Sequence, residues 1–479
     1  MPCEPTSPEY QQSHAYDASE TTPLLESEGS DAVRRTKSGK PFPTWQILLL
    51  CYARLMEPIA MFSVFPYIAQ MVQHNENLPD SDVGFYSGLI ESLFSIVEMA
   101  VLPIWCDLAD RMGRKPALVL SLIGMAAGPV FFGLSRSIFQ MILFRCLAGL
   151  VSGSGLIIRT MIGDQVTSDT QAKAYSWFAI ADNLGAFLGP IIGGALADPV
   201  RQYPRFFAGI KFFEDYPYAL PGIVVGAIDA TGVITSALFL EETLDKREPE
   251  SAEDETTEDP KQAISYWQLA KAPGVCIALW LYGHVNLLMD SFTAVLPVAL
   301  YTPVSIGGMG WSPSKISLYM AVQAGSQSLW LLLVFPWLQR RMGAKGVLRI
   351  CSIGYPIFCA GFIAMNALLR EKSEESLVWF WIVTFFVTSF GPAVFMSFTA
   401  AQLVVNDAAP NPHLLGKLNT MAMVFHSGIR SVSPGVATAI YAVGVRGQVA
   451  WGYLFWAVLI PLSASLGIAL RWLSNDRKG

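Results

Sequence analysis

Apolar stretches long enough to cross a membrane recur along most of the chain, and they restrict its fold more than any other feature. A transmembrane helix needs about 20 predominantly apolar residues. The 479 residues are 52% hydrophobic and only 15% charged, whereas soluble domains carry about 25% charge. We predict twelve spans, at residues 45–72, 83–105, 116–135, 138–162, 171–197, 219–240, 275–302, 314–338, 346–369, 377–404, 415–443 and 449–472.

A short charged turn occurs twice, once in each half of this series. Residues 111–115 read Arg-Met-Gly-Arg-Lys, and residues 341–345, 230 positions later, read Arg-Met-Gly-Ala-Lys. Gly-Pro at 189–190 and Ser-Pro at 433–434 are separated by a similar 244 positions. Repeats at a nearly constant offset indicate a duplicated architecture, and transporters place their solute site where such repeats meet. We therefore predict an all-α integral membrane protein with two pseudo-symmetric six-helix bundles.

The ends and the middle of the chain differ in composition from the spans. Residues 1–42 are polar, rich in Ser, Thr, Glu and Pro, and lack the apolar region of a signal peptide, so we predict a disordered cytosolic tail. The acidic stretch 241–271 is predicted to be a cytosolic linker between the halves. The remaining boundaries place the bundles at 43–240 and 272–473 and a second cytosolic tail at 474–479.

Lysine and arginine positions predict the orientation in the membrane. These residues concentrate in the tails and in the loops on the same side, and the loop between the first two spans contains none. Cytosolic loops carry such an excess, so we predict that both termini are cytosolic. Residues 198–218, with three basic side chains, are an exception on the outer side. We expect a multi-pass protein of the plasma membrane rather than the vacuolar membrane.

Several function classes are excluded by what the sequence lacks. No basic cluster is long enough to follow a phosphate backbone, so nucleic-acid binding is not expected. The seven cysteines show no CxxC spacing, which argues against a zinc site or disulfide framework. No GxSxG, HExxH or phosphate-binding GxxxxGK[ST] motif occurs, so we predict no enzyme, no catalytic residue, no metal and no cofactor.

The expected partners are a small organic solute, protons and the lipid bilayer, with the protein itself a monomer.

Ionisable side chains inside the predicted spans are the candidates for a proton and substrate pathway. Each costs about 2.5–3.5 kcal/mol at the centre of a membrane on insertion scales, so it usually faces a cavity or a partner. Arg54 and Glu57, for example, are three residues apart and share one helical face. The pathway candidates are Arg54, Glu57, Glu91, Arg145, Asp182 and Asp290.

The predicted proton carrier is either Glu57 or Glu91, with Arg145 setting its proton affinity. Burial favours a neutral carboxyl group and a nearby arginine favours the carboxylate, and a carrier needs these two effects to compete. A static buried ion pair that fixes helix packing is the alternative interpretation. Packing or simple solvation is expected of four other ionisable residues, His284, His426, Glu98 and Asp164.

Three segments resemble motifs of the major facilitator superfamily. Residues 106–115 resemble its pattern G-x-L-A-D-R-x-G-R-K between spans two and three, although Cys106 replaces the first glycine and Asp107 stands where a basic residue is common. Residues 145–149 resemble the arginine motif of its fourth span. Residues 185–194 resemble G-x-x-x-G-P-x-x-G-G in the fifth span, a pattern associated with its drug/proton antiporters.

Shorter segments narrow the resemblance to one branch of the superfamily. Residues 54–58, 63–67, 216–221 and 241–244 are similar to fungal members of the twelve-span drug/proton antiporters, a group near the zinc-induced facilitator-like transporters. The resemblance extends over about residues 43–472 and implies the fold with two six-helix bundles that the duplication predicts.

The resemblance also implies roles for the two main motifs. In the charged turn, Asp110 is implied to contact the start of a helix in the other half and to latch the outward-open state. In the fifth span, Pro190 and its neighbouring glycines are implied to form a hinge that supports antiport. An ordinary positive-inside loop and a generic packing face are the alternatives. The latch residues are Asp110, Arg111, Gly113, Arg114 and Lys115, and the hinge residues are Gly185, Gly189, Pro190, Gly193 and Gly194.

The function implied by these motifs is secondary active transport. We predict a proton-coupled antiporter that exports small organic molecules, such as drugs or secondary metabolites, by alternating access. A proton symporter that imports a nutrient or organic ion is the alternative within transport. A non-transporting membrane sensor is the alternative from another class.

Overall fold

The computed structural model describes residues 42–76, 78–166, 168–244, 266–410 and 414–471. Every regular element within these residues is a helix, and they contain no strand. The predicted tails and most of the predicted linker lie outside the described residues.

The described residues of the first half form eight long or medium helices and three short ones. Many of their apolar side chains are buried, and close packing of this kind holds helices together in a membrane. The helices are α2 (Thr44–Phe62), α3 (Phe65–Glu76), α4 (Val83–Met112), α5 (Arg114–Gly133), α6 (Ile138–Leu150), α7 (Ser154–Gln165), α8 (Ser168–Leu196), α9 (Pro199–Gln202), α10 (Pro204–Phe207), α11 (Lys211–Asp215) and α12 (Ala219–Phe239).

The second half repeats the pattern of long helices joined by short turns. The helix that spans Glu374–Ser389 begins with a capping box formed by Ser373 and Ser376. In this box each serine hydroxyl accepts a hydrogen bond from the other residue's backbone N–H. The elements are α13 (Tyr266–Ala270), α14 (Val275–Tyr301), η1 (Val304–Ile306), α15 (Pro313–Leu329), η2 (Trp330–Val334), α16 (Phe335–Glu371), α17 (Glu374–Ser389), η3 (Gly391–Phe395), α18 (Met396–Asp407), α19 (Leu415–Arg446), η5 (Val449–Gly452) and α20 (Leu454–Ala469).

These elements combine into twelve spans. Nine helical stretches of the described residues are long and apolar enough to cross a membrane. One of them, Pro313–Glu371, bends at Gly343 and therefore contains two spans. Adding α19 and α20 gives the predicted twelve. The prediction of an all-α membrane protein is confirmed, although the second span extends to Met112 and the last begins at Leu454.

The repeated charged turn has the same backbone feature in both halves. Gly113 has φ +107° and Gly343 has φ +68°, values that residues with a Cβ atom rarely adopt. Each glycine thus allows a sharp change of direction between two apolar helices. The sequence repeat therefore corresponds to a repeated turn geometry.

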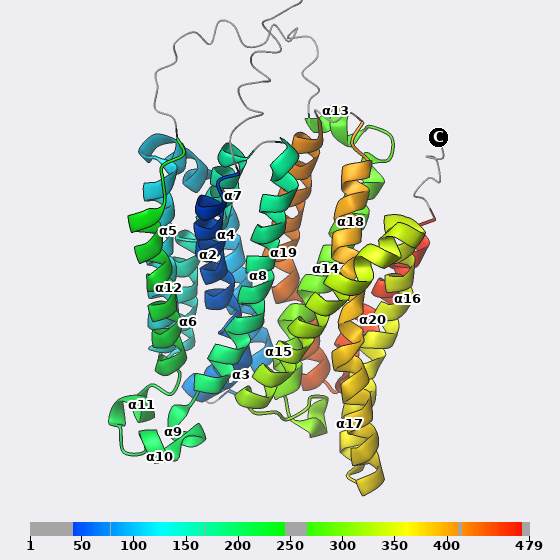
Figure 1. Ribbon diagram of the computed structural model, residues 1–479. Helices are drawn as coiled ribbons and strands as arrows, with labels where there is room; N and C mark the ends of the chain where they lie inside the picture. The colour runs from blue at the N-terminus through cyan, green and yellow to red at the C-terminus, as the bar shows by residue number, and fades with distance from the viewer. Residues whose placement is uncertain (1–41, 77, 167, 245–265, 411–413, 472–479) are drawn as a thin grey trace, which may run out of the picture. The chain divides into compact units, whose positions relative to one another are not determined.

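Two helix pairs form the main contacts between the halves. The helices α4 and α19 pack against one another, and so do α8 and α15. Figure 1 shows the helices α2–α12 gathered beside the helices α14–α20, with α8, α15 and α19 between the two groups. The short helices α9–α11 lie at the end of the molecule opposite to the start of α2.

The carboxylate of Glu242, just after α12, caps the charged turn at the start of α5. Its Oε1 accepts a hydrogen bond from the N–H of Arg114 at 3.0 Å, and its Oε2 accepts one from the N–H of Lys115 at 3.1 Å. The N–H groups of Thr243 and Leu244 also donate to Oε1. The first N–H groups of a helix have no partner within it, so this carboxylate joins the end of α12 to the start of α5.

We expect Glu242→Ala to lower the free energy of unfolding by about 0.5–2 kcal/mol, as loss of a helix cap does. Partial burial acts to raise the pKa of Glu242, but the four backbone hydrogen bonds outweigh it and lower this pKa below that of an ordinary glutamate. The stabilisation is therefore present at neutral pH and is lost as the pH falls through the lowered pKa.

Thermal unfolding of the purified protein in detergent, measured from neutral to acidic pH, checks this prediction. Glu241→Ala is the matched control, because Glu241 is the exposed neighbour and only its backbone N–H is bonded, to Gln46. Equal melting temperatures for the two variants at neutral pH would contradict the capping role.

Candidate functional site

Arg54 of α2 holds two carboxylates of the first half. Its Nη1 lies 2.6 Å from Oε2 of Glu57, and its Nη2 lies 2.5 Å from Oδ1 of Asp182 on α8. The hydroxyl of Ser154 on α7 also donates to Oε2 of Glu57, at 2.6 Å. The Arg54 guanidinium lies 5.0 Å from the ring centroid of Phe178. The structure thus brings three of the predicted pathway residues into one cluster.

The two acids of this cluster differ in their exposure. The Glu57 side chain is 15% exposed, whereas the Asp182 side chain is 45% exposed. The two ion pairs share one arginine, and a second arginine, Arg159, also lies 5.0 Å from the ring centroid of Phe178. Protonation of one acid would therefore leave Arg54 paired with the other.

Glu91 and Arg145 form a separate pair deeper in the first half. Nη2 of Arg145 lies 2.8 Å from Oε2 of Glu91, and the side chains are only 6% and 7% exposed. The rings of Phe94 and Phe132 flank the guanidinium, at 4.7 and 5.8 Å. Removing one partner of such a pair typically costs about 3–5 kcal/mol. In this conformation the pair has the enclosed geometry of a static ion pair that fixes helix packing.

A small cavity connects the two groups of charges. Glu57 and Arg145 both line it, together with apolar side chains that include Met125 and Phe132. Its volume is about 20 Å³, and a cavity of roughly 10–15 Å³ suffices for one water molecule. A water molecule in this cavity would have the Glu57 carboxylate and the Arg145 guanidinium as polar neighbours.

Asp290 lies in the second half, where its neighbour is His426. Oδ2 of Asp290 on α14 is 3.5 Å from Nε2 of His426 on α19. The rings of Tyr282 and Phe398 each have their centroids 6.2 Å from that of the imidazole. The sequence interpretation of His426 as a packing residue misses this acid, because the two positions are far apart in the chain. Their proximity depends on how α14 packs against α19.

Glu98 and Asp164 also have cationic neighbours. Glu98 is largely buried, so the expectation of simple solvation was wrong for it, whereas Asp164 is exposed. Nη1 of Arg430 on α19 lies 3.8 Å from Oε2 of Glu98 on α4, which makes this contact one between the two halves. Arg114 pairs with Asp164 at the end of α7. The sequence around each acid did not predict these partners, because the partners lie on other helices.

The charged turn is tied to the first half in this conformation. Arg114 reaches Asp164, and the backbone of Arg114 and Lys115 reaches Glu242. Asp110 is exposed, and within the described residues its side chain forms no hydrogen bond or ion pair. Contact of this turn with the other half remains a prediction for a different conformation.

The fifth-span motif presents glycines to two neighbouring helices. Gly185, Gly189 and Gly193 face α2 at four-residue intervals, where a Cβ atom would meet the backbone of that helix. Gly194 instead faces Ser317 of α15 in the second half. Pro190 lies inside α8 between these contacts. The motif therefore forms a close packing face, and its role as a hinge stays a prediction.

Hydrogen bonds link the halves at the end where α9–α11 lie (Figure 1). The hydroxyl of Tyr301 at the end of α14 donates to Oε1 of Gln73 on α3 at 2.5 Å. The hydroxyl of Ser314 on α15 donates to Oε1 of Gln202 at 2.7 Å. These side chains are ordinary polar residues at span ends, so sequence reasoning did not identify them. Together they close this side of the interface between the halves.

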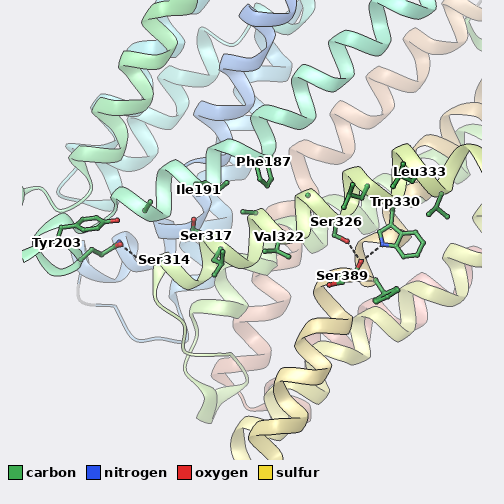
Figure 2. Close-up of a pocket in the computed structure, with 18 residues that line it drawn as sticks. Phe187, Ile191, Tyr203, Ser314, Ser317, Val322, Ser326, Trp330, Leu333 and Ser389 are labelled. Atoms are coloured by element: carbon green, nitrogen blue, oxygen red, sulfur yellow. Dashed lines mark hydrogen bonds between the residues drawn. The ribbon is translucent and has the colours of Figure 1, made fainter.

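Figure 2 shows a cavity of about 830 Å³ between α8, α15 and the end of α17. Its lining is mainly apolar, with Phe187 and Ile191 contributed by α8. The backbone carbonyl of Ser389 accepts hydrogen bonds from Ser326 Oγ at 2.5 Å and from Trp330 Nε1 at 2.8 Å. Trp330 begins the π-helical turn η2, a feature frequent at functional sites. The predicted pathway residues do not line this cavity.

The sequence model of the family described as Major Facilitator Superfamily matches residues 50–434, which is more than half of the chain. The chain belongs to the major facilitator superfamily. It is 37% identical over 466 residues to the efflux pump azaK of Aspergillus niger, and 96% of each chain is covered. It is 24% identical to the protein ZINC INDUCED FACILITATOR-LIKE 1 of Arabidopsis thaliana, over 87% of this chain and 88% of that protein.

The fold is also that of solved members of the superfamily. A bacterial homolog of the human lysosomal transporter Spinster, in an inward-facing and unoccupied conformation, aligns with a TM-score of 0.62 and 16% identity. The alignment covers 91% of this chain and 95% of that one. The predicted resemblance to the superfamily and to its fungal efflux proteins is thus confirmed. The chain is a multi-pass membrane transporter.

We expect Tyr301→Phe to increase the population of molecules in which the two halves are separated at the side where α9–α11 lie. The variant loses the hydrogen bond to Gln73, and such a bond contributes about 0.5–1.5 kcal/mol, equivalent to a two- to tenfold shift in populations. Spin labels at Arg205→Cys and Val449→Cys, with Cys106 and Cys276 replaced by Ser, report the distance across this side.

Tyr453→Phe is the control for this measurement, because the Tyr453 hydroxyl donates to Asn366 within the second half only. If both phenylalanine variants give the distance distribution of the parent, the hydrogen bond between the halves does not hold this side closed.

Proposed function

We propose that this transporter is a proton-coupled antiporter that exports small organic molecules, in the class of drugs or secondary metabolites. The observation that carries the proposal is the sharing of Arg54 between Glu57 and Asp182. Because two acids share Arg54, one of them can take up a proton while the other keeps its ion pair with the arginine. Relatives named as an efflux pump and as a multidrug transporter support the direction of export.

Glu57 is the better carrier of the two acids predicted from the sequence. It borders the water-sized cavity and pairs with an arginine that Asp182 also engages. Glu91, in contrast, has an arginine that lies between two phenylalanine rings. Because Asp182 competes for Arg54, Glu57 can give up its ion pair with the arginine and bind a proton. An entering solute that interacts with Asp182 or Arg54 would disturb the same balance.

Alternating access supplies the conformational cycle of the proposal. We propose that both termini lie in the cytosol and that the protein lies in the plasma membrane. The side closed by Tyr301 and Gln73 then faces outward. The conformation described here is then the inward-facing one. In the outward-facing state, the halves separate at this side and approach one another at the charged turns. Asp110 would there meet the start of a helix in the second half.

We expect antiport to produce a proton flux opposite to the solute flux. Proteoliposomes that contain the purified protein and a trapped pH-sensitive dye are exposed to a panel of lipophilic dyes, phenolic acids and aromatic amines. A transported compound should alter the internal pH in the direction of exchange. Glu57→Gln should lose this proton flux and keep solute exchange, because the amide cannot bind the proton.

Glu371→Gln is the control, since Glu371 is exposed at the end of α16. A proton flux in the same direction as the solute would identify the symporter of the alternative interpretation. Folded protein that moves no compound of the panel would favour the non-transporting sensor.

We expect Asp110→Asn to shift the population toward the inward-facing conformation. A carboxylate near a helix N-terminus contributes about 0.3–1 kcal/mol, which corresponds to a two- to fivefold change in the population ratio. The spin-label pair at positions 205 and 449 measures this shift. Asp107→Asn is the matched control, because Asp107 is an exposed acid of the same turn. An identical effect of the two substitutions would argue against a latch at Asp110.

A further inference from the structure

Asp229 on α12 is a buried acid that has no partner. Its exposed fraction is 0%, and neither carboxyl oxygen has a hydrogen-bond partner. A lone aspartate in an apolar span shows no motif, so the sequence gives no sign of this site. The other acids in the interior of the described spans each lie beside a basic side chain: Glu57 and Asp182 beside Arg54, Glu91 beside Arg145, Glu98 beside Arg430, and Asp290 beside His426.

Glycines on both sides of Asp229 define its position. Gly222 and Gly226 face the backbone of α5, and Gly232 faces Met56 of α2. Asp229 follows Gly226 by three residues and precedes Gly232 by three, so it lies on both of these helical faces. The acid therefore sits in the wedge between α5 and α2. The absence of side chains at the three glycines lets both helices approach it closely.

No charged or titratable group of the neighbouring helices is bonded to Asp229. The helices that pack on α12 are α5, α2 and α8. Among the described side chains, the groups on these helices are Cys51, Tyr52, Arg54 and Glu57 on α2, Arg114 and Lys115 on α5, and Lys173, Tyr175 and Asp182 on α8.

Two of the cations on these helices form ion pairs with acids other than Asp229. Arg54 is held by Glu57 and Asp182, and Arg114 by Asp164. Tyr52 shares a hydrogen bond with Thr231, on an exposed face of α12. An unpaired carboxylate in such an enclosed membrane site would cost far more than a neutral acid. Such a site favours the neutral form of Asp229 over the carboxylate.

We propose that Asp229 is a proton-binding site of the transporter, which holds a proton in the conformation described here and releases it toward the cytosol when α2 moves. This inference rests on the proton coupling of the proposed function. The step is an acid dissociation: the O–H bond of Asp229 breaks, the proton passes to a water molecule that enters the wedge, and the electron pair stays on the carboxylate. Entry of that water requires α2 to move away from α12.

The position of α2 couples this site to the cluster around Arg54. The helix α2 packs on α12 with Met56 against Gly232, and the adjacent Glu57 belongs to the charged cluster. The same helix packs on the glycines of α8. A change of charge at Glu57 or a solute near Asp182 would thus act on the helix that closes the wedge. Proton release at Asp229 would follow movement of α2.

Two measurements test this inference with the full chain in proteoliposomes. Infrared spectroscopy needs no solute: the wild type at neutral pH should show the carbonyl stretch of a protonated carboxylic acid, and Asp229→Asn should lack it. The second measurement uses the panel compound that gives the wild type its largest proton flux. Asp229→Asn should reduce this flux to the level of protein-free liposomes and should keep solute exchange in the absence of a pH gradient.

Ser236→Ala controls for the substitution of a buried polar residue on the same helix, and Asp229→Glu keeps the acid in place. Both should retain the proton flux. The inference is overturned if the infrared band is unchanged in Asp229→Asn, if the variant keeps the proton flux of the wild type, or if exchange falls as far as the flux, which indicates a structural acid. A wild type without proton flux for any panel compound refutes the proposed coupling as well, so the two failures are distinguishable.

Discussion

The structure depends on how charge is accommodated inside a membrane. An unpaired ion in this environment is costly, so the arginines at 54, 145 and 430 each have acids beside them. These ion pairs differ in how easily they can rearrange. The Arg145 pair is enclosed and flanked by aromatic rings, whereas Arg54 divides its hydrogen bonds between two acids of different exposure. Exchange of protons is easiest where the neutral and the charged arrangements are close in free energy, and the shared arginine provides that condition.

Close packing of small residues determines which parts can move together. The glycines of α8 lie against α2, and those of α12 lie against both α2 and α5. The helix α2 therefore contacts two surfaces without bulky side chains while it carries Arg54 and Glu57. Surfaces of this kind hold helices near one another and let one helix shift slightly relative to the next. Charge at the cluster and packing around Asp229 are consequently linked through the same helix.

Much of the fold could be predicted from local patterns, whereas the site could be predicted only in part. Apolar runs and the charged turn indicated the spans, the duplication and the superfamily, and the helices follow the predicted order. Arg54 with Glu57 was predictable because three residues separate them on one helix. The pairing of His426 with Asp290 and of Arg430 with Glu98 was not, because each joins helices that are distant in the chain. The isolation of Asp229 could not be predicted for the same reason.

The amino-acid sequence by itself determined the membrane class, the number and order of spans and the family. These properties depend on composition within about 20 residues and on motifs of about ten residues, which are independent of distant segments. The tertiary structure decided which charges neutralise one another, which side of the interface is closed and which acid has no partner. Such contacts arise from the rotation and depth of one helix against another, and neighbouring residues in the chain do not specify them.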